Sequence, residues 1–588
     1  MKSDAQSKIK GIGVSAGVAI GPAFIIEQCG VPVPEYEISQ AQVEKEIKRL
    51  HSAISKVQKH LAQLRLKAET LPVGAEDMEL LIDAYKGMLS NSRLVRGVEE
   101  SIKKQHINAE AAIQKQISAI KADFAAMNDS YLAARADDVG EVGARLMRSL
   151  QQQNYNPFAD APEGCVILAE EITPADAALM DPGRVAGVAT VLGGAESHAA
   201  IIARALGLPA ISGVGALTHG IKTGDTIIID GRKGEIIIRP DAETLHFYRQ
   251  EVARKKQEDK RLKTLRNVPA LTVDGRLISL QANMELPRDL DAVAEAGAMG
   301  VGLLRTEFMF MNRPTLPDEE EQYQMLRGIV EKLHGLPLTV RTLDVGGEKI
   351  ASALGGAIEE SSNPALGLRA IRLGLKRPEL LDTQLTAILR ASMHGPVRIL
   401  IPMISHITQM NQVRSRILQI EKKLHRRGIN IQGLPPLGAM IEIPSAALIA
   451  DSLAKVCDFF SIGSNDLTQY TLAIDRGDDG VAELYDPFHP AILRLIQFTV
   501  AAAWRANIPV ALCGEIAGDA RATPLLLGLG LRELSMSPRR LPAVKNEIMR
   551  ISLPQASKIA DQIMSKTNHA EIMALLQKTF VDSGGREK

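Results

Sequence analysis

The second half of the chain alternates between strand-like and helix-like segments. Eight short apolar or β-branched runs lie near residues 277–283, 300–305, 338–344, 397–403, 437–443, 458–464, 509–514 and 531–536. Helical stretches separate most of them, although the last two spacers are uneven. Eight such units in about 300 residues favour a closed TIM (β/α)8 barrel over an open doubly wound sheet, in which fewer strands are expected. We therefore expect a TIM barrel over residues 270–575.

The first half of the chain has a different pattern. Residues 9–28 are predicted to form one or two strands with glycine turns, and strand-like segments return at 165–169, 185–191 and 226–230. Residues 37–153 are poor in glycine and carry apolar residues at three- and four-residue spacing, which is typical of a helical bundle. We expect a multi-domain α/β protein in which an α/β domain, residues 1–36 and 154–240, contains this bundle as an insertion.

Residues 241–269 are expected to connect the two halves. Residues 241–267 are rich in Arg, Lys, Glu and Gln and contain no turn signal. Such a segment is more often a solvated helix than a ligand site.

Composition excludes several classes of protein. Lysine plus arginine equals aspartate plus glutamate, at 69 each, so no net field points to nucleic acid or a membrane surface. The cysteines are far apart, at Cys29, Cys165, Cys457 and Cys513, which argues against a disulfide framework or a zinc site. No apolar run is long enough to span a bilayer. We expect a cytoplasmic protein without membrane insertion.

Polar residues gather where the predicted barrel strands end, which is where TIM barrels carry their active sites. They are Arg305 and Glu307 after the second strand, Arg341, Asp344 and Lys349 after the third, Glu442 after the fifth, Asn465, Asp466, Asp475 and Arg476 after the sixth, and Cys513 and Glu515 after the seventh. Arginines bind phosphate and carboxylate groups, and carboxylates bind Mg²⁺. Each residue alone has a structural explanation, but together they predict a site for a small anion held through a divalent cation.

A histidine in the first half lies where a Gly-Gly loop meets an alanine-rich segment. Gly193 and Gly194 precede Ser197 and His198, and Gly207 and Pro209 are expected to end the helix that follows. A neutral imidazole at a helix N-terminus can accept a phosphoryl group, because free N–H groups and the helix dipole stabilise the anion. The alternative for this motif alone is a capped surface helix with an incidental histidine.

At these residues the chain resembles Enzyme I of the phosphoenolpyruvate-dependent phosphotransferase system, over nearly its full length. The loop Gly193-Gly194-…-Ser197-His198 is similar to the first family signature, and Asp458-Phe-Phe-Ser-Ile-Gly-Ser-Asn465-Asp466-Leu-Thr-Gln-Tyr-Thr-Leu-Ala-Ile-Asp475-Arg476 to the second. The segments around Arg305, Arg341, Asn363 to Arg369 and Cys513 to Asp519 also match.

The resemblance implies a role for each site residue. His198 would carry the phosphoryl group on Nε2, and Cys513 would protonate the enolate carbon as pyruvate leaves. Phosphoenolpyruvate would be bound by Arg305, Arg341, Asn465, Asp466 and Arg476, with Lys349 and Arg369 close by, and Mg²⁺ by Glu442 and Asp466. The helical insertion would dock an HPr-type phosphocarrier protein, the chain would dimerise through its barrel, and its α/β domain would swivel about residues 241–267.

Two departures leave the branch of the family open. The sugar-uptake branch usually has Arg-Thr before Ser-His, whereas this chain has Ala195-Glu196, and a carboxylate there should raise the pKa of His198 unless it points away. The segment Tyr485-Asp-Pro-Phe-His489-Pro is closer to the nitrogen-regulatory branch, but we do not expect that branch's N-terminal GAF sensor domain in these residues. A nitrogen-regulatory Enzyme I without its sensor domain is therefore the alternative function.

Two rival functions come from other classes. A dikinase or phosphoenolpyruvate synthase would share the histidine domain and the barrel but would carry a large ATP-grasp domain before the histidine, where this chain has only about 160 mostly helical residues. A regulatory scaffold that no longer turns over would not need the full set of inferred catalytic residues.

Overall fold

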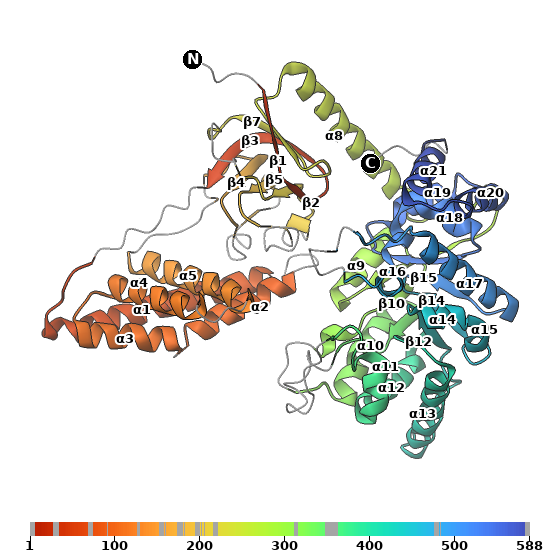
Figure 1. Cartoon of the computed structure of the whole chain (residues 1–588). Coiled ribbons are helices and arrows are strands. Elements are labelled where there is room, and N and C mark those ends of the chain that lie inside the picture. Colours follow the sequence, from red (N-terminus) through yellow and green to blue (C-terminus); the bar gives the residue numbers. More distant parts are fainter. Residues whose placement is uncertain are drawn as a thin grey trace. The chain divides into compact units, whose positions relative to one another are not determined.

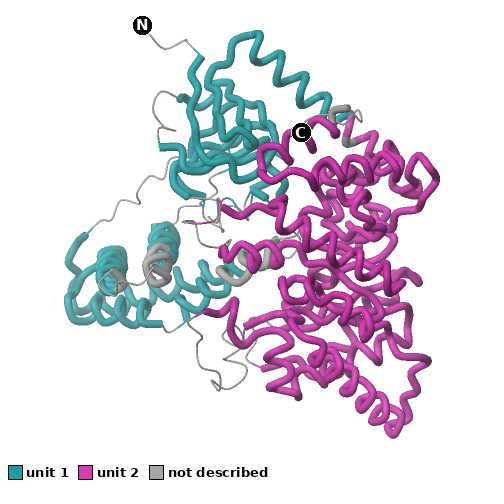
Figure 2. The backbone as a smooth tube through the Cα atoms, turned by 45° about the vertical axis from the view of Figure 1, so that its right-hand side comes forward, with its two compact units in different colours: residues 1–257 teal, residues 258–588 magenta. Residues whose placement is uncertain are grey.

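The chain folds into two compact units, residues 1–257 and 258–588, in a computed structural model (Figure 2). The structure describes residues 6–582 except for 27–34, 69–74, 91, 126–129, 152–157, 159, 173–179, 182, 194–199, 201–202, 205, 216–220, 311–314, 347–362, 476–480 and 482–483. The boundary between the units falls within one long helix, α8 (Ala242–Lys263).

The first unit contains an eight-stranded mixed sheet in the order β1-β8-β7-β3-β4-β5-β6-β2. Its strands are β1 (Ser7–Lys10), β2 (Ile12–Ser15), β3 (Val18–Ile26), β4 (Cys165–Ala169), β5 (Val185–Thr190), β6 (Ala210–Ser212), β7 (Thr226–Asp230) and β8 (Glu235–Ile238). The one or two strands predicted near the N-terminus are three, because Gly11 and Gly17 interrupt the run. Gly17 has a φ of 142°, and a Cβ there would lie 2.8 Å from Pro209 Cγ. The sequence pattern also missed the short strands β6 and β8.

A helical bundle is inserted between the parallel neighbours β3 and β4 (Figure 1, orange). Its helices are α1 (Val43–Ala68), α2 (Ala75–Met88), α3 (Arg93–Gln105), α4 (Ala109–Ala125) and α5 (Ser130–Leu150). Leu50, Leu61 and Leu64 of α1 are buried, as the three- and four-residue spacing predicts. Arg49 ties three helices together, because its guanidinium donates to Glu110 of α4 at 2.5 Å and to the carbonyl of Leu150 in α5 at 3.2 Å.

The second unit is the predicted barrel. Its eight strands all pair in parallel and close when β16 meets β9, with Glu533 opposite Ser279. The strands are β9 (Ser279–Met284), β10 (Val301–Leu304), β11 (Leu338–Arg341), β12 (Val397–Ile401), β13 (Leu437–Ile441), β14 (Phe459–Ile462), β15 (Val510–Leu512) and β16 (Glu533–Met536). The predicted fold class, an α/β protein with an inserted bundle and a C-terminal TIM barrel, is confirmed.

Helices surround the strands and continue to Asp582. They are α9 (Leu290–Ala296), α10 (Glu319–Lys332), α11 (Ala370–Lys376), α12 (Pro378–Ala391), α13 (Ile407–Arg426), α14 (Pro444–Leu448), α15 (Ala450–Leu453), α16 (Ser464–Leu472), α17 (Pro490–Ala506), α18 (Thr523–Gly528), α19 (Leu541–Ile548), α20 (Leu553–Met564) and α21 (His569–Asp582). Figure 1 shows them around the barrel in green to blue.

Side chains alternate between the barrel interior and the surrounding helix layer. In β12, Ile399 and Ile401 belong to the large core shared with the helices, whereas Leu400 belongs to a small separate cluster inside the barrel. Arg398, on the same face as Leu400, pairs at 3.1 Å with Glu533 of β16, a strand on the opposite side of the barrel. Both residues lie at the beginning of their strands, so this ion pair fills the N-terminal end of the interior and leaves the C-terminal end for other groups.

Helix α8 is the charged helix expected near residues 241–267. In the first unit, Tyr248 Oη donates to the buried Asp230 at 3.3 Å. In the second unit, Lys545 Nζ donates to the carbonyls of Leu265 and Arg266 at 3.1 and 3.0 Å, just beyond the end of α8. Each end of the connecting segment is therefore fastened to its own unit by a buried or half-buried polar contact.

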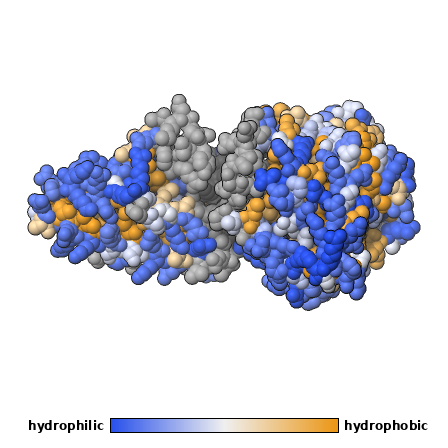
Figure 3. All heavy atoms as spheres, turned by 90° about the horizontal axis from the view of Figure 1, so that it is seen from below, coloured by the Kyte–Doolittle hydropathy of each residue, from blue (hydrophilic) through white to orange (hydrophobic). Residues whose placement is uncertain are grey.

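Among the helices of the described residues, none is long and apolar enough to cross a membrane. Hydrophilic residues cover most of the face seen in Figure 3, with smaller apolar patches between them. The three cysteines in the described part of the chain, Cys165, Cys457 and Cys513, are buried free thiols.

Candidate active site

Six of the predicted site residues lie at the C-terminal ends of the barrel strands, inside the described part of the chain. Arg305 follows β10, Arg341 ends β11, and Glu442 follows β13. Asn465 and Asp466 form the first turn of α16 directly after β14, and Cys513 follows β15. Because all eight strands are parallel, these ends meet at one mouth of the barrel.

Arg341 is held rigidly at this mouth. Its guanidinium pairs with Glu307 at 3.0 Å and with Asp344 at 3.2 Å, and only 9% of its side chain is exposed. Burial opposes its charge, but the carboxylates of Glu307 and Asp344 outweigh burial and raise the pKa of Arg341 above its usual range. The guanidinium therefore stays charged, and two carboxylates fix its plane.

Arg369 shares Asp344 with Arg341. Its Nη2 donates to Asp344 Oδ1 at 2.9 Å, whereas Arg341 uses Oδ2. The Nε atoms of both arginines are buried and have no hydrogen-bond partner among the described residues. A buried donor without a partner is costly, so these two N–H groups hold unused hydrogen-bonding capacity at the mouth.

Arg305 is the more accessible arginine. It pairs with Glu285, and 41% of its side chain is exposed. An exposed ion pair of this kind contributes little to stability. The guanidinium can therefore exchange Glu285 for an anionic ligand at low cost.

Three carboxylates lie together beside the arginines. Ligand atoms of Asp344, Glu442 and Asp466 are within 4.8 Å of one another. Glu442 is fully buried, its Oε1 accepts from the backbone N–H of Met403 at 2.5 Å, and its Oε2 has no partner in the described residues. Burial and the charges of Asp344 and Asp466 raise the pKa of Glu442 to about 8.

This carboxylate arrangement fits a hard divalent cation. An unpartnered buried oxygen and mutually repelling carboxylates are relieved by a bound cation, and oxygen is the ligand type that Mg²⁺ prefers. Sequence reasoning assigned Glu442 and Asp466 to the metal but not Asp344. Since both oxygens of Asp344 hold arginines, its part is to orient Arg341 and Arg369.

The Cys513 thiol lies at the same mouth, over an apolar layer. It is 3% exposed and belongs to the interior cluster with Leu303, Leu400, Met440 and Phe459. Ser461 Oγ donates to its Sγ at 3.2 Å, and the thiol faces the carbonyl of Ile462 at 3.5 Å. Burial raises the pKa of the Cys513 thiol to about 11, so the group carries its proton at neutral pH.

Asn465 is oriented by Glu515 and Tyr485 rather than by the cluster of Asp344, Glu442 and Asp466. Its amide donates to Glu515 Oε1 at 3.3 Å and accepts from the N–H of Glu515 at 2.9 Å. Tyr485 Oη donates to the carbonyl of Asn465 at 3.2 Å. These contacts fix the turn that starts α16.

A buried amide beneath the mouth was missed by sequence reasoning. Gln384 of α12 donates to Thr306 Oγ1 at 3.0 Å and accepts from the N–H of Leu343 at 2.8 Å. Thr306 Oγ1 in turn donates to the carbonyl of Arg341 at 2.9 Å. Gln384 thereby ties together the segments that carry Arg305 and Arg341. The sequence signal that could have identified it is a glutamine on the apolar face of the helix at 378–391.

Three predicted site residues, His198, Lys349 and Arg476, lie outside the described residues. The helix end predicted after His198 is described: Gly207 has a φ of 68°, and the N–H of Leu208 donates to the carbonyl of Ala203 at 2.9 Å. This is the bond pattern with which a left-handed glycine ends a helix.

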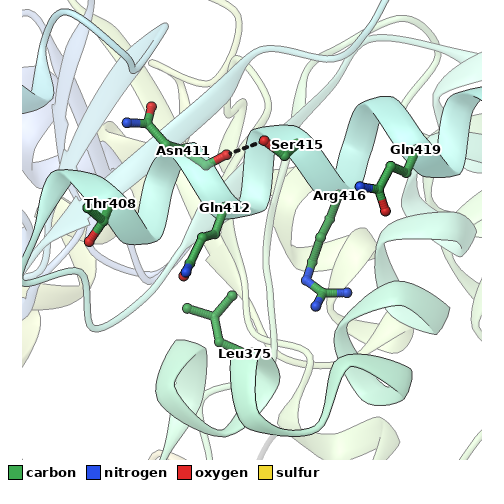
Figure 4. Close-up of a pocket in the computed structure, with 7 residues that line it drawn as sticks. All are labelled: Leu375, Thr408, Asn411, Gln412, Ser415, Arg416 and Gln419. Carbon is green, nitrogen blue, oxygen red and sulfur yellow. Dashed lines mark hydrogen bonds between the residues drawn. The ribbon is translucent and has the colours of Figure 1, made fainter.

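A surface pocket on the outside of the barrel is separate from this group. It is lined by one polar face of α13, from Thr408 to Gln419, and by Leu375 of α11 (Figure 4). Its arginine, Arg416, pairs with Asp382 at 3.0 Å. The pocket contains none of the strand-end residues.

Comparisons with known proteins cover both units. Family models match residues 10–135 (PEP-utilising enzyme, N-terminal), 161–234 (PEP-utilising enzyme, mobile domain) and 259–553 (PEP-utilising enzyme, PEP-binding domain). A phosphoenolpyruvate-protein phosphotransferase of Cupriavidus necator is 41% identical over 97% of this chain and 99% of its own length. One of Bacillus subtilis is 38% identical over 98% of this chain and all of its own length.

A solved structure, the solution structure of an Enzyme I protein, is 33% identical and covers 42% of this chain and 99% of its own, with a TM-score of 0.37. The sequence relatives, by contrast, match both units of the chain. The chain is an enzyme of the transferase class and belongs to the phosphoenolpyruvate–protein phosphotransferase (Enzyme I) family.

Proposed function

We propose that this enzyme transfers the phosphoryl group of phosphoenolpyruvate to its own His198 and then to a histidine of an HPr-type phosphocarrier protein, releasing pyruvate. One observation carries the proposal: arginines, a carboxylate cluster and a protonated thiol converge at one mouth of the barrel. These are the groups needed to bind a phosphorylated carboxylic acid and to protonate its carbon.

The arginines would bind the substrate. Arg305, Arg341 and Arg369 offer guanidinium groups to the phosphate and carboxylate oxygens, and Asn465 adds an amide donor, with Lys349 and Arg476 as further cations. Asp344 and Glu307 keep Arg341 in place before the substrate arrives, so little ordering is needed on binding. Glu442 and Asp466 would hold Mg²⁺, which neutralises charge on the phosphate.

The chemistry divides between two residues. His198 Nε2 forms a bond to phosphorus while the bond from phosphorus to the enolate oxygen breaks, and the guanidinium groups stabilise the charge spread over the phosphoryl oxygens. Cys513 then gives its proton to the enolate carbon, which yields pyruvate. A thiol with a pKa of about 11 suits this role because it keeps its proton until the enolate forms.

The acceptor, the dimer and the location of the protein complete the proposal. The resemblance to Enzyme I implies a phosphocarrier docked on the inserted bundle, a homodimer formed through the barrel, and action in the cytoplasm. The name of its relatives, phosphoenolpyruvate-protein phosphotransferase, supports a protein acceptor. Sugar uptake through the phosphotransferase system would follow from transfer to HPr.

The nitrogen-regulatory branch is the second candidate because of one sequence segment, and this segment contacts the site. The segment that is closer to that branch, Tyr485 to His489, reaches the site through the hydrogen bond from Tyr485 to Asn465. His489 also caps α17, because its Nδ1 accepts from the N–H of Ala491 at 3.2 Å. The segment is therefore built into the substrate-binding mouth.

Transfer rates to two carriers test the acceptor. Enzyme labelled from ³²P-phosphoenolpyruvate is mixed with HPr or with its nitrogen-branch relative, and loss of label is followed in time. We expect faster transfer to HPr, and faster transfer to the relative would assign the chain to the nitrogen branch. If neither carrier removes label from a labelled enzyme, the proposal of an HPr-type acceptor is wrong.

A further inference from the structure

Ser461 is a buried hydroxyl in direct contact with the Cys513 sulfur. It lies in β14 among apolar residues, is 1% exposed, and donates to Sγ at 3.2 Å. A buried serine hydroxyl has lost its hydrogen bonds to water, so its side-chain hydrogen bond to the sulfur, the one found among the described residues, points to its role.

Two neighbouring residues of β14 contact the sulfur. Ser461 donates to it, and the carbonyl of Ile462, the next residue of β14, accepts from the thiol at 3.5 Å. The same carbonyl accepts from the backbone N–H of Cys513 at 3.0 Å, which fixes the cysteine relative to the strand. With Ser461 holding the sulfur, the S–H bond can turn from the Ile462 carbonyl toward the barrel mouth without moving the sulfur itself.

Proton transfer from the thiol to carbon leaves a negative charge on the Cys513 sulfur, in surroundings that disfavour charge. The sulfur lies on an apolar layer formed by Leu303, Leu400, Met440 and Phe459. A thiolate in such surroundings is destabilised unless a donor faces it. Hydrogen bonds to charged groups are stronger than those between neutral groups, so the contact with Ser461 strengthens once the thiolate forms.

We propose that Ser461 is a positioning residue for this step: it aims the Cys513 thiol and stabilises the thiolate that remains after carbon is protonated. The inference rests on the proposed role of Cys513 as the proton donor. In this step the S–H bond breaks and a C–H bond forms at the enolate carbon, while the enolate oxygen becomes the ketone oxygen of pyruvate. The negative charge passes to sulfur, Ser461 keeps its own proton, and sulfur later takes a proton from water.

The test compares Ser461→Ala with Thr499→Val in the same chain. Thr499, in α17, is also a fully buried residue, but its hydroxyl donates to the carbonyl of Leu495 in its own helix at 2.9 Å rather than to the sulfur. Pyruvate formation is measured in single turnovers in H₂O and D₂O, and phosphoenolpyruvate affinity is measured separately. The alkylation rate of Cys513 by iodoacetamide is read at pH 8.5 from its peptide by mass spectrometry.

Ser461→Ala should slow pyruvate formation by about 10- to 100-fold, the loss expected for a hydrogen bond to a charged group. Its solvent isotope effect should rise because the proton step becomes limiting, and alkylation should slow about tenfold because less thiolate is present. Substrate affinity should not change, and Thr499→Val should match the wild type. A loss of packing alone would not raise the isotope effect.

Two results overturn the inference in distinguishable ways. If Ser461→Ala matches Thr499→Val in rate, isotope effect and alkylation while Cys513→Ala is slow, Ser461 has no role in the step. If Cys513→Ala forms pyruvate at the full rate, Cys513 is not the donor, and both the proposed chemistry and the role of Ser461 are wrong.

Discussion

Replacing Glu442 with glutamine tests whether the carboxylate cluster is built for a cation. Burial and the charges of Asp344 and Asp466 raise the pKa of Glu442 from 4.5 to about 8, although Arg341 acts in the opposite direction. Between these two pH values the folded protein holds a proton that the unfolded chain has lost. Its free energy of unfolding therefore falls as the pH rises through this window.

The size of the effect follows from the window. At 1.36 kcal/mol per pKa unit, raising the pH from 5 to 7.5 lowers the free energy of unfolding of the wild type by on the order of 3 kcal/mol. Glutamine does not titrate, and its Oε1 can still accept from the N–H of Met403. In the absence of divalent cations, the free energy of unfolding of Glu442→Gln should therefore rise by about 3 kcal/mol relative to that of the wild type over this pH range.

The assay is urea unfolding followed by the fluorescence of Trp504. This is the only tryptophan of the chain and lies in α17 of the barrel, so it reports on the unit that contains Glu442. Added Mg²⁺ should restore the stability of the wild type at pH 7.5 and leave Glu442→Gln unchanged. Glu533→Gln, a carboxylate change at the opposite end of the barrel interior, should keep the wild-type response to Mg²⁺. If the free energies of unfolding of the wild type and Glu442→Gln change equally with pH, this reasoning is refuted. Equal stabilisation of both proteins by Mg²⁺ would also refute it.

Three further changes test other parts of the site. Cys513→Ala should slow pyruvate formation by roughly 10²- to 10⁴-fold, as expected for loss of a general acid, with phosphoenolpyruvate binding retained in equilibrium dialysis; full turnover would remove the thiol as donor. Arg341→Lys should weaken phosphoenolpyruvate binding by about 10- to 100-fold in calorimetry, because an ammonium group cannot reproduce the planar guanidinium held by Glu307 and Asp344; unchanged affinity would mean that Arg341 does not touch the substrate. Gly463→Ala should weaken Mg²⁺ binding, since its Cβ would lie 2.7 Å from Met440 Cε and 3.0 Å from Glu442 Oε2; wild-type Mg²⁺ affinity would argue against a cation at Glu442.

The barrel and its mouth were predictable because their signals are local and periodic. Eight apolar runs gave eight strands, and parallel strands bring their C-terminal residues together without any knowledge of side-chain contacts. The observed strands are shorter than most of the runs. Beyond the end of β12, for example, Met403 has a φ of 56°, which turns the backbone so that its N–H reaches Glu442.

The contacts that organise the mouth could not be predicted in the same way. Asp344 has the chemistry of a metal ligand in the sequence, and only three-dimensional placement shows that its two oxygens hold two arginines. Ser461 is one polar residue in an apolar strand, and its partner is 52 residues away. Gln384 likewise acts on Thr306, 78 residues earlier. Such pairings depend on the closure of the barrel and leave no periodic trace in the sequence.

The central claim is that His198 carries the phosphoryl group. The most direct measurement incubates the full-length enzyme with ³²P-phosphoenolpyruvate and Mg²⁺ and maps the label by digestion under alkaline conditions, which preserve phosphohistidine. We predict one labelled peptide, the one that contains His198, with label retained in His489→Ala and abolished in His198→Ala. Label that persists at the wild-type level in His198→Ala would contradict the account.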